Sequence, residues 1–134
     1  MPDPESRSDQ PIRVLVVDAD DRVRESMTGL LAIGGRVVVV GSADSAATAL
    51  ELVASTSPDV VIVDPRLPEV DAGLAFIAQL RAVSPGVLIL ATSWSDALEA
   101  TALSGGADGF VRKTFRPNDL VAAIVATRRR TDAA

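Results

Sequence analysis

The chain contains no cysteine and no histidine. Without cysteine there can be no disulfides, no thiolate metal sites and no thiol nucleophiles. Without histidine, imidazole general bases, His-based catalytic triads and most zinc sites are excluded as well. Lysine occurs once, as Lys113. Any chemistry here therefore depends on carboxylates, hydroxyl groups, backbone groups, one amine and a hard cation.

Aromatic residues are also scarce, at 3% of the chain, so valine, alanine and leucine must fill the core. The hydrophobic share of 48% and the length of 134 residues predict one globular domain. No apolar run approaches the length of a membrane span, and the polar, acidic N-terminus lacks a signal-peptide core. We therefore expect a cytoplasmic protein without a membrane partner. The net charge of −5 argues against direct binding of nucleic acid.

Strand and helix patterns alternate five times along the chain. Strands are expected at 12–17, 36–40, 60–63, 87–91 and 109–112. The first helix should begin at a cap formed by Asp20 or Asp21 and end at Gly34, and the others should span 45–55, 74–83, 96–104 and 117–128. Residues 1–11 read as a disordered tail, 12–128 as the domain and 129–134 as a C-terminal tail. This alternation predicts an α/β fold with helices on both faces of a parallel sheet.

Four of the predicted strands end in polar residues. The apolar strand 60–63 is followed by Asp64, and the first, fourth and fifth strands are followed by Asp18, Thr92 and Lys113. The carboxyl ends of parallel strands share one edge, where α/β proteins build their sites. Two acids, a hydroxyl and an amine should therefore converge.

Each of these residues also has a simpler interpretation. Asp64 could be a turn acid, Thr92 could bond its own turn, and Lys113 could be a solvated surface lysine. The carboxylates between Asp18 and Asp21 could cap the helix that follows. The combination of all four strand ends favours a functional site over these separate roles.

Three stretches around these strand ends form a pattern: residues 14–18 (VLVVD), 58–64 (PDVVIVD) and 106–113 (GADGFVRK). In this order and spacing, they resemble the response-regulator receiver domain of bacterial two-component systems. The resemblance covers residues 12–128. It implies a flavodoxin-like, doubly wound sheet of five parallel strands in the order 2-1-3-4-5, with five helices.

The resemblance implies a phosphorelay signal-transduction function rather than an enzyme. Asp64 would accept a phosphoryl group from a histidine kinase or phosphotransfer protein, as a carboxylate nucleophile. The hydroxyl of Thr92 would contact the phosphate, and Lys113 would pair with it. Mg²⁺ prefers hard oxygen ligands. The implied metal ligands are Asp18, Asp64 and the backbone carbonyl of Arg66, with Asp20 as a further candidate.

The resemblance also implies a switch. Phosphate on Asp64 would draw Thr92 inward and let Phe110 repack, which changes the face formed by the fourth helix, fifth strand and fifth helix. Trp94, the only tryptophan, lies at the edge of that face. It is either an anchor for a partner or a ring partly buried under a loop. The face would bind an output protein or a second copy of the chain.

Two residues depart from the family pattern. Ala19 stands where the pocket usually has a second acid, which predicts weak Mg²⁺ binding. Thr114 replaces the proline that usually follows the lysine.

Two other functions remain open. The first is a binding-only receiver that is never phosphorylated, which Ala19 favours. The second is a phosphatase resembling the haloacid-dehalogenase family, because residues 16–20 (VVDAD) fit its Asp-x-Asp motif with Asp18 as nucleophile. The absence of a later acid pair and of a cap segment argues against the phosphatase.

Overall fold

The computed structural model describes residues 10–114 and 116–133, and it contains one sheet of five parallel strands in the order β2-β1-β3-β4-β5. The strands are β1 (Ile12–Val17), β2 (Val37–Ala43), β3 (Val60–Val63), β4 (Leu88–Ser93) and β5 (Gly109–Arg112). Within the described ranges, the helices are α2 (Asp21–Leu31), α3 (Ala46–Thr56), α4 (Val70–Val83), α5 (Glu99–Ser104) and α6 (Pro117–Ala133), with a 3₁₀ turn at Asp96–Leu98. The expected fold class, strand order and five helices are confirmed.

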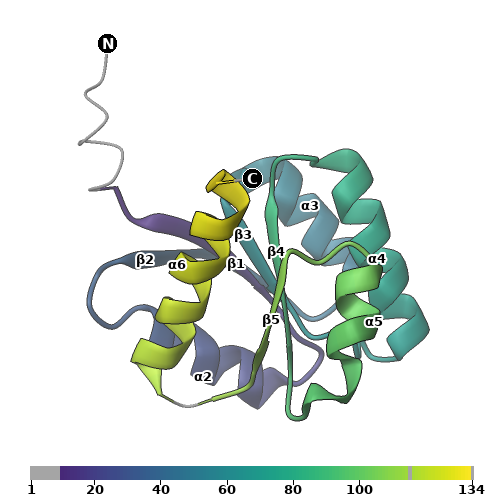
Figure 1. Cartoon of the computed structure of the whole chain (residues 1–134), viewed down its shortest axis with the longest axis horizontal. Coiled ribbons are helices and arrows are strands. Elements are labelled where there is room, and N and C mark those ends of the chain that lie inside the picture. The colour runs from purple at the N-terminus through teal and green to yellow at the C-terminus, as the bar shows by residue number, and fades with distance from the viewer. Residues whose placement is uncertain (1–9, 115, 134) are drawn as a thin grey trace.

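The helices form two layers around the sheet (Figure 1). Val14 and Val16 of β1 pack with α2 and α6 on one face, where the core includes Met27 and Ile124. Alternate residues of β1 and β3 pack with α3, α4 and α5 on the other face, where the core includes Phe76. Successive side chains of a strand point to opposite faces, so one apolar strand serves both layers.

The strand β3 is the centre of the sheet and is buried along its whole length. Its sequence consists of four β-branched residues, and each is at most 1% exposed. β-branched side chains pack well on a pleated surface. This strand therefore fixes the position of Asp64, which follows it directly.

The end of β2 differs from the sequence prediction. Gly41 was expected to close the strand, but the strand continues to Ala43. The register shifts between Val14 and Leu15, where Val39 and then Gly41 are the partners, so Val40 is an extra residue in a bulge. A side chain at position 41 would crowd Leu15, which explains a glycine inside this strand.

The helix α4 begins at Val70, four residues before the predicted start at Leu74. The sequence suggested a loop before Leu74 because of the nearby prolines. In the structure, Gly73 lies in the first turn, and a Cβ at this position would overlap the carbonyl of Pro65. The glycine thus serves the close packing of α4 against the segment that follows Asp64.

Three further predicted boundaries, those of β4, α6 and the N-terminal tail, either differ from the structure or involve residues that it does not describe. β4 includes Thr92, which was expected to follow it. The helix α6 continues past Arg128 to Ala133, so most of the predicted tail 129–134 is helical, and the hydroxyl of Thr131 donates to the carbonyl of Thr127. The predicted tail 1–11 lies outside the described residues except for its last two positions. In the part of the chain that is described, no helix is long and apolar enough to cross a membrane.

A side-chain clamp that the sequence did not suggest holds the start of β5. Arg81 of α4 forms an ion pair with Asp108 at 2.6 Å and donates to the carbonyls of Val87 and Gly106. Asp108 also accepts from the backbone N–H of Ile89. The clamp joins α4, β4 and the turn before β5, and so helps to place Lys113 at the other end of that strand.

Candidate functional site

The strand register brings the four predicted residues to the same edge of the sheet. Val17, Val63 and Ala91 are paired neighbours across β1, β3 and β4. The residues one step further along these three strands are Asp18, Asp64 and Thr92, which therefore lie side by side. Lys113 directly follows β5, and its backbone N–H donates to the carbonyl of Ser93 at the end of β4.

Lys113 joins the two acids. Its Nζ lies 2.7 Å from Asp18 Oδ2 and 2.6 Å from Asp64 Oδ2, and its side chain is only 4% exposed. The solvated surface lysine considered from the sequence is therefore not what the structure contains. Burial alone would lower the pKa of Lys113, but the hydrogen bonds and charges of Asp18 and Asp64 outweigh it and raise the pKa above its ordinary value.

The other carboxylate oxygens bond the backbone. Asp18 Oδ1 accepts from the N–H of Asp20 at 2.9 Å, and Asp64 Oδ1 accepts from the N–H of Arg66 at 2.8 Å. Each acid thus has one oxygen in an ion pair with Lys113 and the other in a backbone hydrogen bond, and among the described residues Asp18 Oδ2 makes no hydrogen bond besides its ion pair. These contacts fix the orientation of both acids toward Lys113 and place the backbone of Arg66 beside Asp64.

Thr92 is buried at the carboxyl end of β4, next to the strand that carries Asp64. Among the described residues, its Oγ1 has no hydrogen-bond partner. A buried hydroxyl without a partner is costly, by roughly 1–3 kcal/mol. Such a group needs an explanation, and a ligand atom that accepts its proton would provide one.

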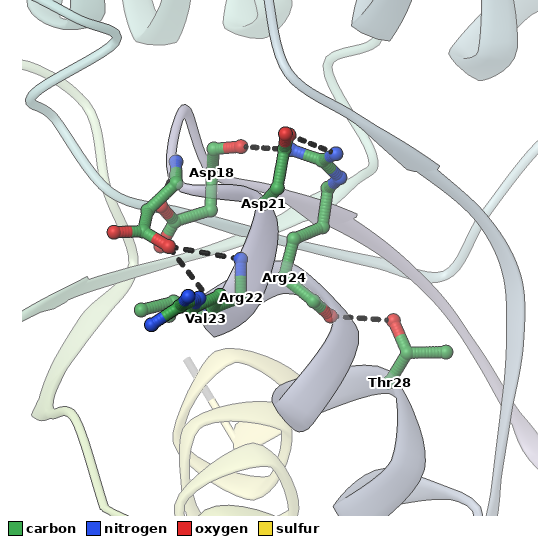
Figure 2. A network of polar contacts seen from close by, with 7 residues as sticks. Asp18, Asp21, Arg22, Val23, Arg24 and Thr28 are labelled. Atoms are coloured by element: carbon green, nitrogen blue, oxygen red, sulfur yellow. Dashed lines mark hydrogen bonds and ion pairs between the residues drawn. The ribbon is translucent and has the colours of Figure 1, made fainter.

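The loop after Asp18 is held by Arg24 (Figure 2). The guanidinium donates to the backbone carbonyl of Asp18 at 2.9 Å and to the carboxylate of Asp21 at 2.6 Å. The carbonyl of Arg24 in turn accepts from the hydroxyl of Thr28. Arg24 was not among the residues predicted from the sequence, although its spacing of three from Asp21 is that of a helical ion pair.

Asp20 caps the helix α2. Its Oδ1 accepts from the N–H groups of Arg22 at 2.9 Å and Val23 at 3.1 Å, as expected for one of the two candidate caps. The hydrogen bond from Val23 contributes most to a pKa of Asp20 below its ordinary value, with that from Arg22 acting in the same direction. Asp20 is exposed, so its role as a metal ligand stays a prediction.

Phe110 and Trp94 lie beside this pocket. Phe110 in β5 is half-buried against the core on the α3, α4 and α5 side. Trp94 is 51% exposed, and Lys113 Nζ lies 5.3 Å from the centre of its ring. The carbonyl of Trp94 accepts from the Arg112 guanidinium at 3.3 Å. Trp94 therefore contacts the pocket lysine as well as solvent.

The sequence matches the family of the response regulator receiver domain over residues 14–125. The response regulator MprA of Mycolicibacterium vanbaalenii is 37% identical over 123 residues, which covers 90% of this chain and 52% of the relative. MprA of Mycobacterium ulcerans is 36% identical over 122 residues and covers 90% of this chain and 51% of the relative. The chain spans about half the length of the curated relatives it matches.

Solved structures share the fold. The signal receiver domain of NarL from Mycobacterium tuberculosis matches with a TM-score of 0.78 at 34% identity, over 87% of this chain and 95% of that one. A LuxR-family two-component response regulator from Aurantimonas sp. matches with a TM-score of 0.77 at 31% identity, over 87% of this chain and 84% of that one.

Proposed function

The chain belongs to the response regulator receiver domain family, and on this premise we propose that it is a signalling switch that accepts a phosphoryl group on Asp64. Members of the family work with histidine kinases or phosphotransfer proteins and are generally not enzymes. The observation that supports the proposal best is the buried, unpartnered hydroxyl of Thr92 beside an acid that is already held by Lys113. This arrangement offers a nucleophile, a hydrogen-bond donor and a positive charge for a phosphoryl group.

The proposed step is a transfer of one phosphoryl group. A carboxylate oxygen of Asp64 forms a bond to phosphorus while the phosphorus–nitrogen bond of a phosphohistidine breaks, and the imidazole leaves with the bonding electron pair. Lys113 neutralises negative charge on the transferred group, and the hydroxyl of Thr92 donates to one of its oxygens. Both roles use groups that already lie at this edge of the sheet.

Receiver domains typically bind Mg²⁺ in this acidic pocket. In this chain, Asp18 and Asp64 each have one oxygen on Lys113 and the other on a backbone N–H. Across residues 10–114 and 116–133, no three or more acidic side chains are grouped so that they could hold a metal ion. The carboxylates are suitable in type, but the donor set does not fit a tightly held Mg²⁺.

The switch would act through the face formed by α5, β5 and α6. This is the face that the sequence analysis described as the fourth helix, fifth strand and fifth helix. A phosphoryl group that binds Thr92 would pull β4 toward Asp64 and leave space for half-buried Phe110 to repack. Trp94 lies at the edge of this face and would then change its contact with Lys113. We propose that the face binds an output protein or a second copy of this chain.

Intact mass after incubation with acetyl phosphate and Mg²⁺ tests the proposal. Wild type should gain the mass of one phosphoryl group, and Asp64→Asn should gain none because it lacks the nucleophile. Asp59→Asn, an acid at the opposite end of β3, is the matched control and should be labelled like wild type. Label on Asp64→Asn that is lost from Asp18→Asn would contradict the proposal and revive the phosphatase, which the family comparisons do not favour. Failure to label wild type would favour the binding-only receiver.

A further inference from the structure

We propose that a groove at the opposite edge of the sheet from Asp64 binds an apolar α-amino acid. The groove has a volume of about 520 Å³, and it is lined by the starts of β3 and β4 and by the ends of α3, α4 and α6. In Figure 1, α6 ends at the label C, beside α3. Small-molecule sites in proteins have volumes of roughly 300–1,000 Å³. None of the described residues that line the groove belongs to the pocket around Asp64, so the proposal goes beyond the phosphoryl-accepting switch and does not depend on it.

The base of the groove is apolar. The buried side chains that line it are at most 8% exposed and include Val53, Val60, Val87 and Leu88. At the end of α4, Val83 also lines the groove and is 62% exposed, more than any other large apolar side chain in the described residues. An exposed apolar side chain that continues a buried apolar lining offers surface that a ligand can remove from water. A ligand for this groove therefore needs an apolar body.

The rim of the groove carries charges of both signs. Arg128 and Asp132 line it near the end of α6. Their spacing of four is one at which opposite charges on a helix commonly pair. Neither of them forms an ion pair with any other residue in the described part of the chain. A ligand with a carboxylate and an ammonium group would supply the missing partner of each.

A second acid, Asp59, lies on the same rim but is already partly engaged. Its Oδ2 accepts from the backbone N–H of Arg13 at 2.9 Å. The ammonium group of the amino acid therefore pairs with Asp132. The carboxylate pairs with Arg128, whose guanidinium can donate two parallel hydrogen bonds to it.

Hydroxyl groups complete the polar rim. Ser57, Ser84 and Thr131 all line the groove, and their oxygens can accept hydrogen bonds from an ammonium group, which donates three. The hydroxyl of Thr131 donates its own hydrogen to the carbonyl of Thr127, which leaves its oxygen available as an acceptor. The rim thus suits a small zwitterion, and the base suits an apolar side chain.

Titration with L-leucine and with three compounds that each lack one part of it tests the proposal. Isoamylamine lacks the carboxylate, isocaproate lacks the ammonium group, and glycine lacks the apolar body. In a ¹H–¹⁵N correlation spectrum, the amide signals of Ser57 and Gly86 report on the groove, and that of Arg66 reports on the pocket around Asp64. L-Leucine should shift the first two signals saturably and leave the third unchanged. Each of the other compounds should bind about five- to tenfold more weakly than L-leucine.

Two variants of α6 test the charge contacts one at a time. Arg128→Gln should weaken binding of L-leucine about five- to tenfold and leave that of isoamylamine within about twofold, because only the carboxylate loses its partner. Asp132→Asn should weaken L-leucine by a similar factor and leave isocaproate within about twofold, because only the ammonium group is affected. Arg129→Gln, an exposed neighbour that does not line the groove, is the matched control and should bind L-leucine like wild type.

A variant of α3 tests whether binding takes place in the groove itself. Ala54→Phe should abolish the shifts of Ser57 and Gly86, because its ring would fill space that the ligand needs. Melting curves show whether each variant is folded. If Ala54→Phe does not fold, the variants of Arg128 and Asp132 decide the question.

Three results would overturn the proposal. The first is the lack of a saturable shift at Ser57 and Gly86 with L-leucine, or a shift confined to Arg66. The second is binding of isoamylamine, isocaproate or glycine within about twofold of L-leucine, because the groove would then not recognise the whole amino acid. The third is an Arg128→Gln variant that binds L-leucine as tightly as Arg129→Gln does. Labelling of Asp64 by acetyl phosphate needs no amino acid, so failure of the proposed phosphorylation is distinguishable from failure of this inference.

Discussion

The side chain of Lys113 carries a positive charge, but only 4% of it is exposed to solvent. Removing it in Lys113→Met would leave Asp18 and Asp64 close together and without their shared partner. Breaking a buried ion pair by removing one partner costs roughly 3–5 kcal/mol of unfolding free energy. We expect Lys113→Met to lose about 3 kcal/mol in urea denaturation at neutral pH, against less than 0.5 kcal/mol for exposed Arg22→Gln.

The pH dependence of this contribution has a definite sign. The folded-state pKa of Lys113 is raised, so its stabilisation is fully present below the ordinary lysine pKa and is lost as the pH rises through the folded pKa. Wild type and Lys113→Met should therefore approach each other in stability in strongly alkaline solution. A difference that stays constant across that alkaline range would show that the ion pairs with Asp18 and Asp64 are not its source.

At the scale of elements, the start of α2 depends on one side chain. Asp20→Ala removes the acceptor of two backbone N–H groups, whereas Asp20→Asn keeps an oxygen there and loses only the charge. The melting temperature should therefore fall more for Asp20→Ala than for Asp20→Asn at neutral pH. Equal losses in the two variants would mean that the charge, and not the cap, is what matters.

The cap of α2 can also be tested through the charge of Asp20. Its pKa is lowered in the folded protein, so its charge-dependent stabilisation is present above the ordinary aspartate pKa and is lost as the pH falls through the lowered value. The difference between wild type and Asp20→Asn should accordingly shrink in acid. Melting curves recorded over this acidic range measure it, and an advantage of wild type that grows in acid would contradict the assignment.

The strand β5 and the helix α6 meet where only glycine fits. A Cβ on Gly109 would lie 2.7 Å from Thr127 Oγ1 and 2.9 Å from its Cγ2, and Thr127 is buried. Gly109→Ala should lose about 1–3 kcal/mol of unfolding free energy through overpacking. The same change in a Thr127→Ala background should cost less, and Gly86→Ala, which meets no neighbour, is the control. If Gly109→Ala lowers the unfolding free energy equally in wild type and in Thr127→Ala, the strain does not come from contact with Thr127.

At the scale of the whole molecule, the fold could be predicted because its signals are local. The apolar run of β3, the strand-end acids and the alternation of strand and helix patterns all lie within short stretches of sequence. Parallel topology then brings the strand ends together without knowledge of any contact. For this reason the sequence predicted the edge at which Asp18, Asp64, Thr92 and Lys113 lie.

What could not be predicted depends on contacts between distant parts of the chain. The burial of Lys113 requires both acids and the Trp94 ring, and none of these is its neighbour in sequence. The helix α4 was predicted to begin only at Leu74, because the role of Gly73 appears only where α4 meets Pro65. The Arg81–Asp108 clamp spans 27 positions, and the sequence around Asp108 does not reveal which residue it pairs with. Tertiary packing decided each of these features.

The most direct test of the account is to identify the aspartate that carries phosphate in wild type. Borohydride reduces an aspartyl phosphate to homoserine, which survives peptide mass mapping. Trypsin separates the two candidates, because Asp18 falls between Arg13 and Arg22 and Asp64 between Arg36 and Arg66. After treatment with acetyl phosphate, the account predicts homoserine at position 64 and none at position 18. Homoserine at position 18, or at neither position, would contradict it.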